Sequence, residues 1–156
     1  TNENKKIINL ILNSNLKNFN VTLRFHPNSQ FNNEKFTKQI STNFNKSNIN
    51  HSVSINKHLA DDLKKCSIAL ISSGSSLINC IDSGVFPIIY KTREIIDTPA
   101  NNNPKIFKFV KNKYDVNNIL KKEKINISKF NLKKASNFSN KYFNNINYRL
   151  LKKILK

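Results

Sequence analysis

Several features are scarce or missing in this 156-residue chain, and each shortage excludes a class of protein. No apolar run approaches the roughly 18 residues that a membrane-spanning helix needs. The first residues also lack the basic and then apolar pattern of a signal peptide. Methionine is absent, and Thr1 begins in the middle of a helical pattern. We therefore expect that this chain does not cross a bilayer and that it is a fragment of a longer protein.

Cysteine is the next scarce residue, with only Cys66 and Cys80 in the chain. The two do not form a CxxC pair, and no histidine pair stands at metal-ligand spacing, so the sequence holds no zinc-site pattern. A disulfide between them requires an exported protein. Two buried free thiols are the favoured interpretation.

Acidic residues are also few: nine, against 27 lysines and arginines, which gives a net charge of +18. Asn, Lys and Ile supply almost half of the chain, a bias typical of A+T-rich coding sequence, so much of the lysine is background. Positive charge favours anionic partners such as phosphates, acidic lipid surfaces or nucleic acid, without choosing among them.

The length and the 38% hydrophobic content fit one packed domain spanning residues 1–156. Apolar periodicity predicts helices and short β-rich strands in alternation. Helices are expected over residues 3–18, 32–46 and 115–123, and one or two more within 128–156. A further helix is expected after Asn56, and another from Leu77 to Ser83-Gly84. Asn56 and Asp115 are the expected caps of the helices that they begin. The expected strands are 21–25, 51–55, 67–71, 85–90 and 106–110, with a loop at 97–104.

This alternation predicts an α/β fold, a Rossmann-like parallel sheet with helices on both faces. The opening helix has no strand before it. We therefore expect an upstream strand, and a whole amino-terminal domain, to precede Thr1 in the complete protein.

Two segments follow the carboxyl ends of expected strands, where ligands bind in open parallel sheets. The first is Arg24-Phe25-His26-Pro27, and the second is Ser72-Ser73-Gly74-Ser75-Ser76. A helix amino end with serine hydroxyls can hold a phosphate. An arginine fork can grip phosphate oxygens, and a histidine can donate a hydrogen bond or a proton near neutral pH.

Plainer interpretations exist for each segment. A loop of serines before a helix is often only a cap, His26 fits a turn, and Arg24 alternates with apolar neighbours as a solvent-facing residue does. The pairing of both segments at adjacent strand ends favours a phosphate site. Asp61 and Asp62 are interpreted as the solvated face of a helix.

The order of these motifs resembles a known family. Four segments are similar to the carboxyl-terminal domain of GT-B bacterial surface-polysaccharide glycosyltransferases with HP and Ser-Ser motifs. They are Leu23-Arg24-Phe25-His26-Pro27, the run from Leu59 to Ile71, Ser72-Ser73-Gly74-Ser75-Ser76, and the run from Gly84 to Tyr90. The likeness spans residues 5–92. It includes two branches, the sialyl- and polysialyltransferases that use CMP-sugars and the CDP-glycerol polymerases of teichoic-acid synthesis. Gly74, where the second branch has tyrosine, favours the first.

The resemblance implies the roles of the site residues. His26 would contact the donor phosphate and stabilise the leaving group, while Arg24, Ser73, Gly74, Ser75 and Ser76 would bind the same phosphate. The donor would be a CMP, CDP or UDP derivative, and the acceptor a glycan or a lipid-linked molecule. No metal or cofactor is expected, and the general base would belong to the amino-terminal domain, so the fragment alone would be inactive.

Other functions stay open at this point. One is a CDP-polyol phosphotransferase, one is a basic module that binds nucleic acid or a membrane surface, and one is an epimerase of the same fold. No RNA- or DNA-binding motif favours nucleic acid. The resemblance implies a cytoplasmic protein, and peripheral contact with an anionic inner membrane face is left open.

Overall fold

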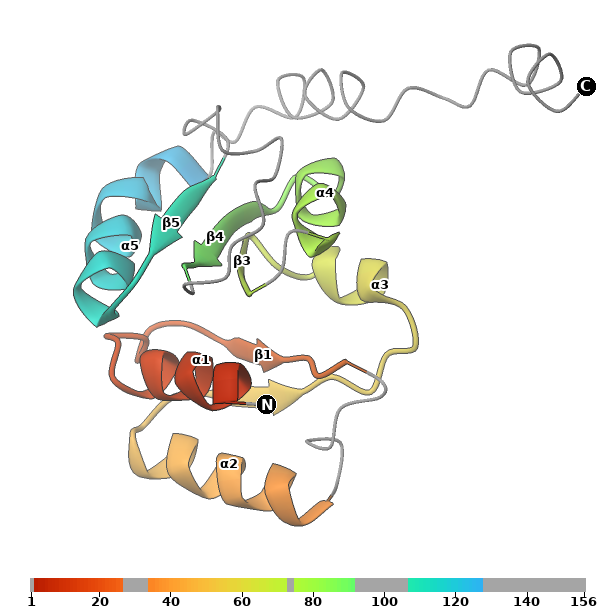
Figure 1. Cartoon of the computed structure of the whole chain (residues 1–156), viewed down its shortest axis with the longest axis vertical. Helices are drawn as coiled ribbons and strands as arrows, with labels where there is room; N and C mark the ends of the chain where they lie inside the picture. Colours follow the sequence, from red (N-terminus) through yellow and green to blue (C-terminus); the bar gives the residue numbers. More distant parts are fainter. Residues whose placement is uncertain (1, 27–33, 73–74, 92–106, 128–156) are drawn as a thin grey trace, which may run out of the picture.

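A computed structural model describes residues 2–26, 34–72, 75–91 and 107–127 of the chain (Figure 1). Within these ranges helices and strands alternate along the sequence. The helices are α1 (Asn2–Leu12), α2 (Glu34–Lys46), α3 (Leu59–Leu63), α4 (Ser75–Asp82) and α5 (Lys113–Ile127). The strands are β1 (Val21–Leu23), β2 (His51–Val53), β3 (Ile68–Ile71), β4 (Phe86–Tyr90) and β5 (Lys108–Val110). The expected loop at 97–104 and the helices within 128–156 lie outside the described residues.

Every strand pairing in the described residues is parallel. β1 pairs with β2, and β4 pairs with β3 on one side and with β5 on the other. The protein is therefore a mixed α/β fold of parallel strands flanked by helices, which confirms the predicted fold class. The expectation of one continuous sheet is wrong, since the ladders form a two-stranded sheet and a three-stranded sheet.

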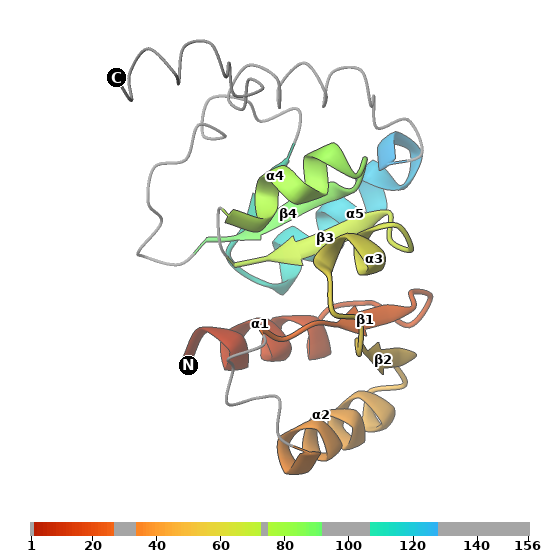
Figure 2. The ribbon, with the colours of Figure 1, turned by 90° about the vertical axis from the view of Figure 1, so that its right-hand side faces the viewer.

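One core nevertheless spans the two sheets. Apolar residues of α1, α2 and β1 pack in the same cluster as residues of β4, β5 and α5. Figures 1 and 2 both show β1, and not β2, on the side of the three-stranded sheet. Side-chain packing therefore joins sheets that no ladder connects within the described ranges. The buried residues of this cluster are Ile8, Leu10, Ile11, Leu16, Leu23, Ile40, Phe44, Ile49, Phe86, Ile88, Val110, Val116 and Leu120.

The two most apolar strands in the sequence, β3 and β4, differ in how deeply they are buried. β4 is buried from Phe86 to Ile89 because it lies between two partner strands. β3 has equally apolar residues but is only half-buried throughout, since it forms the edge of its sheet. A run as apolar as residues 67–71 predicts a strand buried on both faces, and this prediction is wrong for β3.

Local hydrogen bonds explain where the elements end. α1 stops at Leu12, earlier than predicted, and the Ser14 hydroxyl donates to the Leu10 carbonyl at 2.7 Å. Serine satisfies backbone groups locally in this way, which competes with helix continuation. α4 ends as predicted before Gly84, whose φ of 70° is readily adopted only by a residue without a Cβ.

The amino end of α5 is capped by a residue other than the one expected. Asn112 Oδ1 accepts hydrogen bonds from the amides of Tyr114 at 2.9 Å and Asp115 at 3.1 Å. The Asp115 carboxylate reaches back to the amides of Lys111 and Asn112. This reciprocal pattern is a capping box, in which Asn112 is the cap and Asp115 its partner.

Candidate functional site

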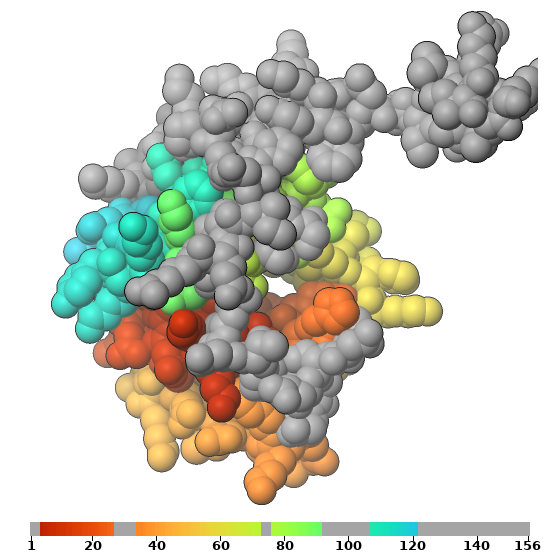
Figure 3. Space-filling model, in the orientation of Figure 1, coloured from red at the N-terminus to blue at the C-terminus, as the bar shows by residue number. Residues whose placement is uncertain are grey.

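The carboxyl ends of the strands lie along one edge of the molecule. Figure 2 shows the carboxyl end of β1 and the start of α4 on the same side of the molecule, at the left of the view. Arg24 and His26 follow β1, and Ser72 follows β3 just before α4 starts at Ser75. Figure 3 views this edge and shows the surface hollowed between the orange atoms after β1 and the yellow and green atoms opposite. The two segments singled out in the sequence thus share an edge.

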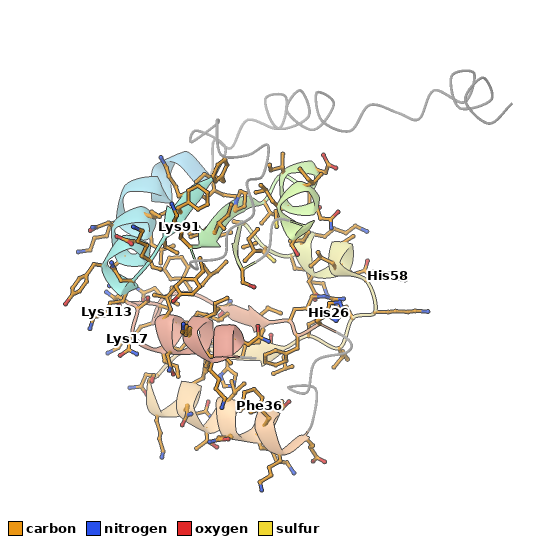
Figure 4. The ribbon with its side chains drawn as sticks, viewed as in Figure 1. Lys17, His26, Phe36, His58, Lys91 and Lys113 are labelled. Carbon is orange, nitrogen blue, oxygen red and sulfur yellow. The ribbon has the colours of Figure 1, made fainter. Side chains whose placement is uncertain are left out.

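His26 is exposed at the tip of the β1 segment. Phe25, its neighbour, packs edge-on against Phe36 of α2, with 6.3 Å between the ring centroids. Figure 4 shows His26 and Phe36 on opposite sides of the backbone that leaves β1. The aromatic contact fixes the backbone beside His26 and leaves the imidazole at the surface.

Ser76 is half-buried in the first turn of α4, a helix of eight residues with no acidic residue in that turn. Leu77 and Ile81 anchor the helix in a core shared with Ile89 and Phe107. Ser75 begins the helix, while Ser73 and Gly74 lie outside the described residues. The helix amino end therefore offers positive partial charge at the same edge as His26.

Arg24 turns away from the solvent-facing position that its alternation suggests. Its guanidinium forms an ion pair with Asp62 of α3 and donates to the carbonyls of Asn56 at 2.9 Å and Lys57 at 3.0 Å. A longer contact of 3.5 Å reaches the Ser54 hydroxyl. Arg24 thus joins the end of β1 to the segment that connects β2 with α3.

Asp62 was predicted to lie on a solvated face, and this prediction is wrong. Only 7% of the residue is exposed, because it shares the inward face of α3 with Leu59 and Leu63. Its carboxylate accepts hydrogen bonds from Ser54 Oγ at 2.7 Å and from Asn56 Nδ2 at 2.6 Å. Asp61, by contrast, makes only a 3.8 Å ion pair with exposed Lys64.

The environment of Asp62 keeps it ionised. Burial by itself raises the pKa of a carboxyl group, but the hydrogen bonds from Ser54, Asn56 and Arg24 and the charge of Arg24 outweigh burial. The pKa of Asp62 is consequently below its usual value of 3.8. Its helical spacing, three residues after Leu59 and four before Cys66, was the signal that could have placed it inward.

Asn56 does not cap α3 as expected, because its amide is bound to Asp62. His58 occupies the cap position and makes no side-chain capping hydrogen bond.

Cys66 and Cys80 are both free thiols in the structure, with Cys80 buried and Cys66 half-buried. The prediction of free thiols is confirmed, and burial is complete only for Cys80.

Comparisons with protein-family models, with curated proteins and with solved structures found no match to this chain. No helix in the described residues is both long enough and apolar enough to span a membrane. Over the same residues, no group of three or more histidine, cysteine or acidic side chains is arranged to hold a metal ion.

Proposed function

We propose that this chain is the donor-binding domain of a glycosyltransferase that uses a nucleotide-activated sugar, with a CMP-sugar favoured, in the synthesis of a surface polysaccharide. One observation carries the proposal. The strands are parallel within each sheet, and the segment with His26 and the start of α4 follow the carboxyl ends of β1 and β3 on the same side of the molecule. Ligands of parallel α/β sheets bind outside such ends. A cytoplasmic location belongs to the same proposal.

The chemistry required of such a site is binding a phosphate that gains negative charge as the sugar departs. The amino end of α4 offers backbone N–H groups and positive partial charge, and Ser76 adds a hydroxyl donor. An N–H of the His26 imidazole donates a hydrogen bond to the phosphate, which stabilises the negative charge that develops there. Displacement at the sugar carbon further requires a base, which we assign to the amino-terminal domain.

Arg24 takes a different role in this proposal from the one inferred from the sequence. Its guanidinium is engaged by Asp62 and by two backbone carbonyls. An arginine held in this way is a positioning residue, because it fixes the backbone that presents His26 without offering its fork to a ligand.

The proposal is tested by calorimetric titration of the purified chain with CMP, UDP and cytidine. His26→Ala and Ser76→Ala each remove one charge-assisted hydrogen bond, so we expect the Kd for CMP to rise about 10- to 100-fold. The control is Ser83→Ala, which changes an exposed serine beyond the other end of α4 and leaves the Kd unchanged. In the complete enzyme, His26→Ala should abolish most transfer activity while the protein still folds.

Two results would discard the proposal. One is nucleotide affinity that is the same in His26→Ala, Ser76→Ala and the wild type. The other is absence of CMP and UDP binding together with steeply salt-dependent binding to RNA or anionic vesicles, which would identify a basic binding module.

A further inference from the structure

The segment between β2 and α3, residues 54–58, is held in place by side chains from two other parts of the fold. Ser54 and Asn56 donate to the Asp62 carboxylate, and the backbone amide of Asn56 donates to Ser54 Oγ at 3.2 Å. Arg24 donates to the carbonyls of Asn56 and Lys57. Several hydrogen bonds therefore hold the backbone of the segment at once, and they share the Asp62 carboxylate and the Arg24 guanidinium.

Besides Lys57, two residues of this segment, Ile55 and His58, are exposed. Ile55 is 97% exposed, the largest exposed fraction of any large hydrophobic residue in the described ranges. His58 is exposed as well, and it occupies a helix cap position without capping. Ser, Thr, Asp and Asn are the residues that capping favours. Neither side chain contributes to the packing or capping that holds the segment.

The segment also lies beside His26. The side chain of Arg24, two residues before His26, donates through Nη2 to the backbone carbonyl of Lys57, one residue before His58, at 3.0 Å. Figure 4 shows the two histidines on the same side of the molecule, one leaving β1 and one entering α3. Two exposed imidazoles on the same side of the molecule suit the anionic phosphate of a nucleotide, because each can donate a hydrogen bond to a phosphate oxygen.

We propose that His58 is a second contact of the donor phosphate, and that the Arg24–Asp62 ion pair sets its spacing from His26. The inference rests on the proposed function and deepens it. Imidazole N–H groups on two separate segments bind one phosphate from two directions, which a single histidine cannot do. Arg24 and Asp62 act through the two histidines and are positioning residues.

NMR titration of the imidazole signals tests this assignment, because the chain has only three histidines. His51 is the internal reference, since its ring packs 5.1 Å from Phe44 in the core. We expect CMP to move the signals of His26 and His58 with the same Kd, and cytidine, which lacks the phosphate, to move neither. Single histidine-to-glutamine variants assign the signals.

Affinity measurements complete the test. His58→Gln should raise the Kd for CMP about tenfold. Asp62→Asn should do the same and should also shift both signals without nucleotide, at a temperature where circular dichroism shows the variant folded. Asp61→Asn, the matched change on the exposed side of α3, should alter neither quantity.

The possible failures are distinguishable. If CMP moves the His26 signal alone and His58→Gln binds CMP normally, the role of His58 is overturned while the proposed function stands. If CMP and UDP move neither signal, the proposed function and this inference are both overturned. If Asp62→Asn folds and leaves signals and Kd unchanged, the positioning role of the ion pair is refuted.

Discussion

Replacing Asp62 with alanine should destabilise the protein far more than replacing its neighbour Asp61. Asp62→Ala leaves the Arg24 guanidinium, the Ser54 hydroxyl and the Asn56 amide without their shared acceptor. The side chains of Arg24 and Asp62 are 21% and 8% exposed, so water compensates only in part. Removing one partner of a buried ion pair costs about 3–5 kcal/mol, and the partial exposure of Arg24 argues for the lower figure.

Asp61→Ala removes only the 3.8 Å pair with Lys64, whose side chain is 75% exposed. An exposed pair of this kind contributes about 0.5 kcal/mol or less. Urea unfolding followed by far-ultraviolet circular dichroism measures both losses, since the chain has no tryptophan to report by fluorescence. A loss of about 3 kcal/mol corresponds to a fall in Tm of roughly 6–12 °C for a domain of this size.

The dependence on pH supplies an independent check. The pKa of Asp62 lies below 3.8 in the folded protein, so its stabilising effect is complete above that value and is lost as pH falls through the folded pKa. The stability difference between wild type and Asp62→Asn should therefore be constant near neutral pH and should shrink below about pH 4. Equal losses for Asp61→Ala and Asp62→Ala, or a difference that persists at pH 2, would refute the reasoning.

Two further predictions concern the thiols and the start of α5. Burial, and then the nearby Cys66, raise the pKa of Cys80 to about 12. In native protein at pH 8, Ellman's reagent should therefore not modify Cys80. The Cys66→Ser variant, in which Cys80 is the remaining thiol, should react only after unfolding. Rapid modification of native Cys66→Ser would contradict this placement. Asn112→Ala removes the cap of α5 and should lower the free energy of unfolding in urea by about 1 kcal/mol. Asn118→Ala, at an exposed position within the same helix, should not lower it. Equal losses for the two variants would exclude Asn112 as the cap.

Much of the fold was predictable from local pattern. The alternation of apolar periods indicated every described helix and strand, because periods of 3.6 and 2 record which face of an element is buried. Gly84 marked the end of α4 for a reason within its own backbone. Boundaries were less accurate: β1 and β2 have three residues each where five were expected, because strand ends depend on partners rather than on propensity.

Part of the candidate site was likewise predictable from the sequence, and part was not. His26, Ser75 and Ser76 were identifiable because residues that follow strands in an α/β chain gather at one edge. Asp62 was misjudged because a charged residue in a helix was taken to face solvent, and the alternation of Arg24 with apolar neighbours did not indicate its ion pair with Asp62. Only the fold brings two residues 38 positions apart into one ion pair and turns both inward.

The sequence by itself determined the class of the fold, the free thiols and the two strand-end segments, since these follow from spacing along the chain and from composition. The tertiary structure decided which strand is central, how the parallel ladders divide between two sheets, and which charged groups are buried together. The physical reason is that burial and pairing depend on elements distant in sequence, and packing sets those neighbours.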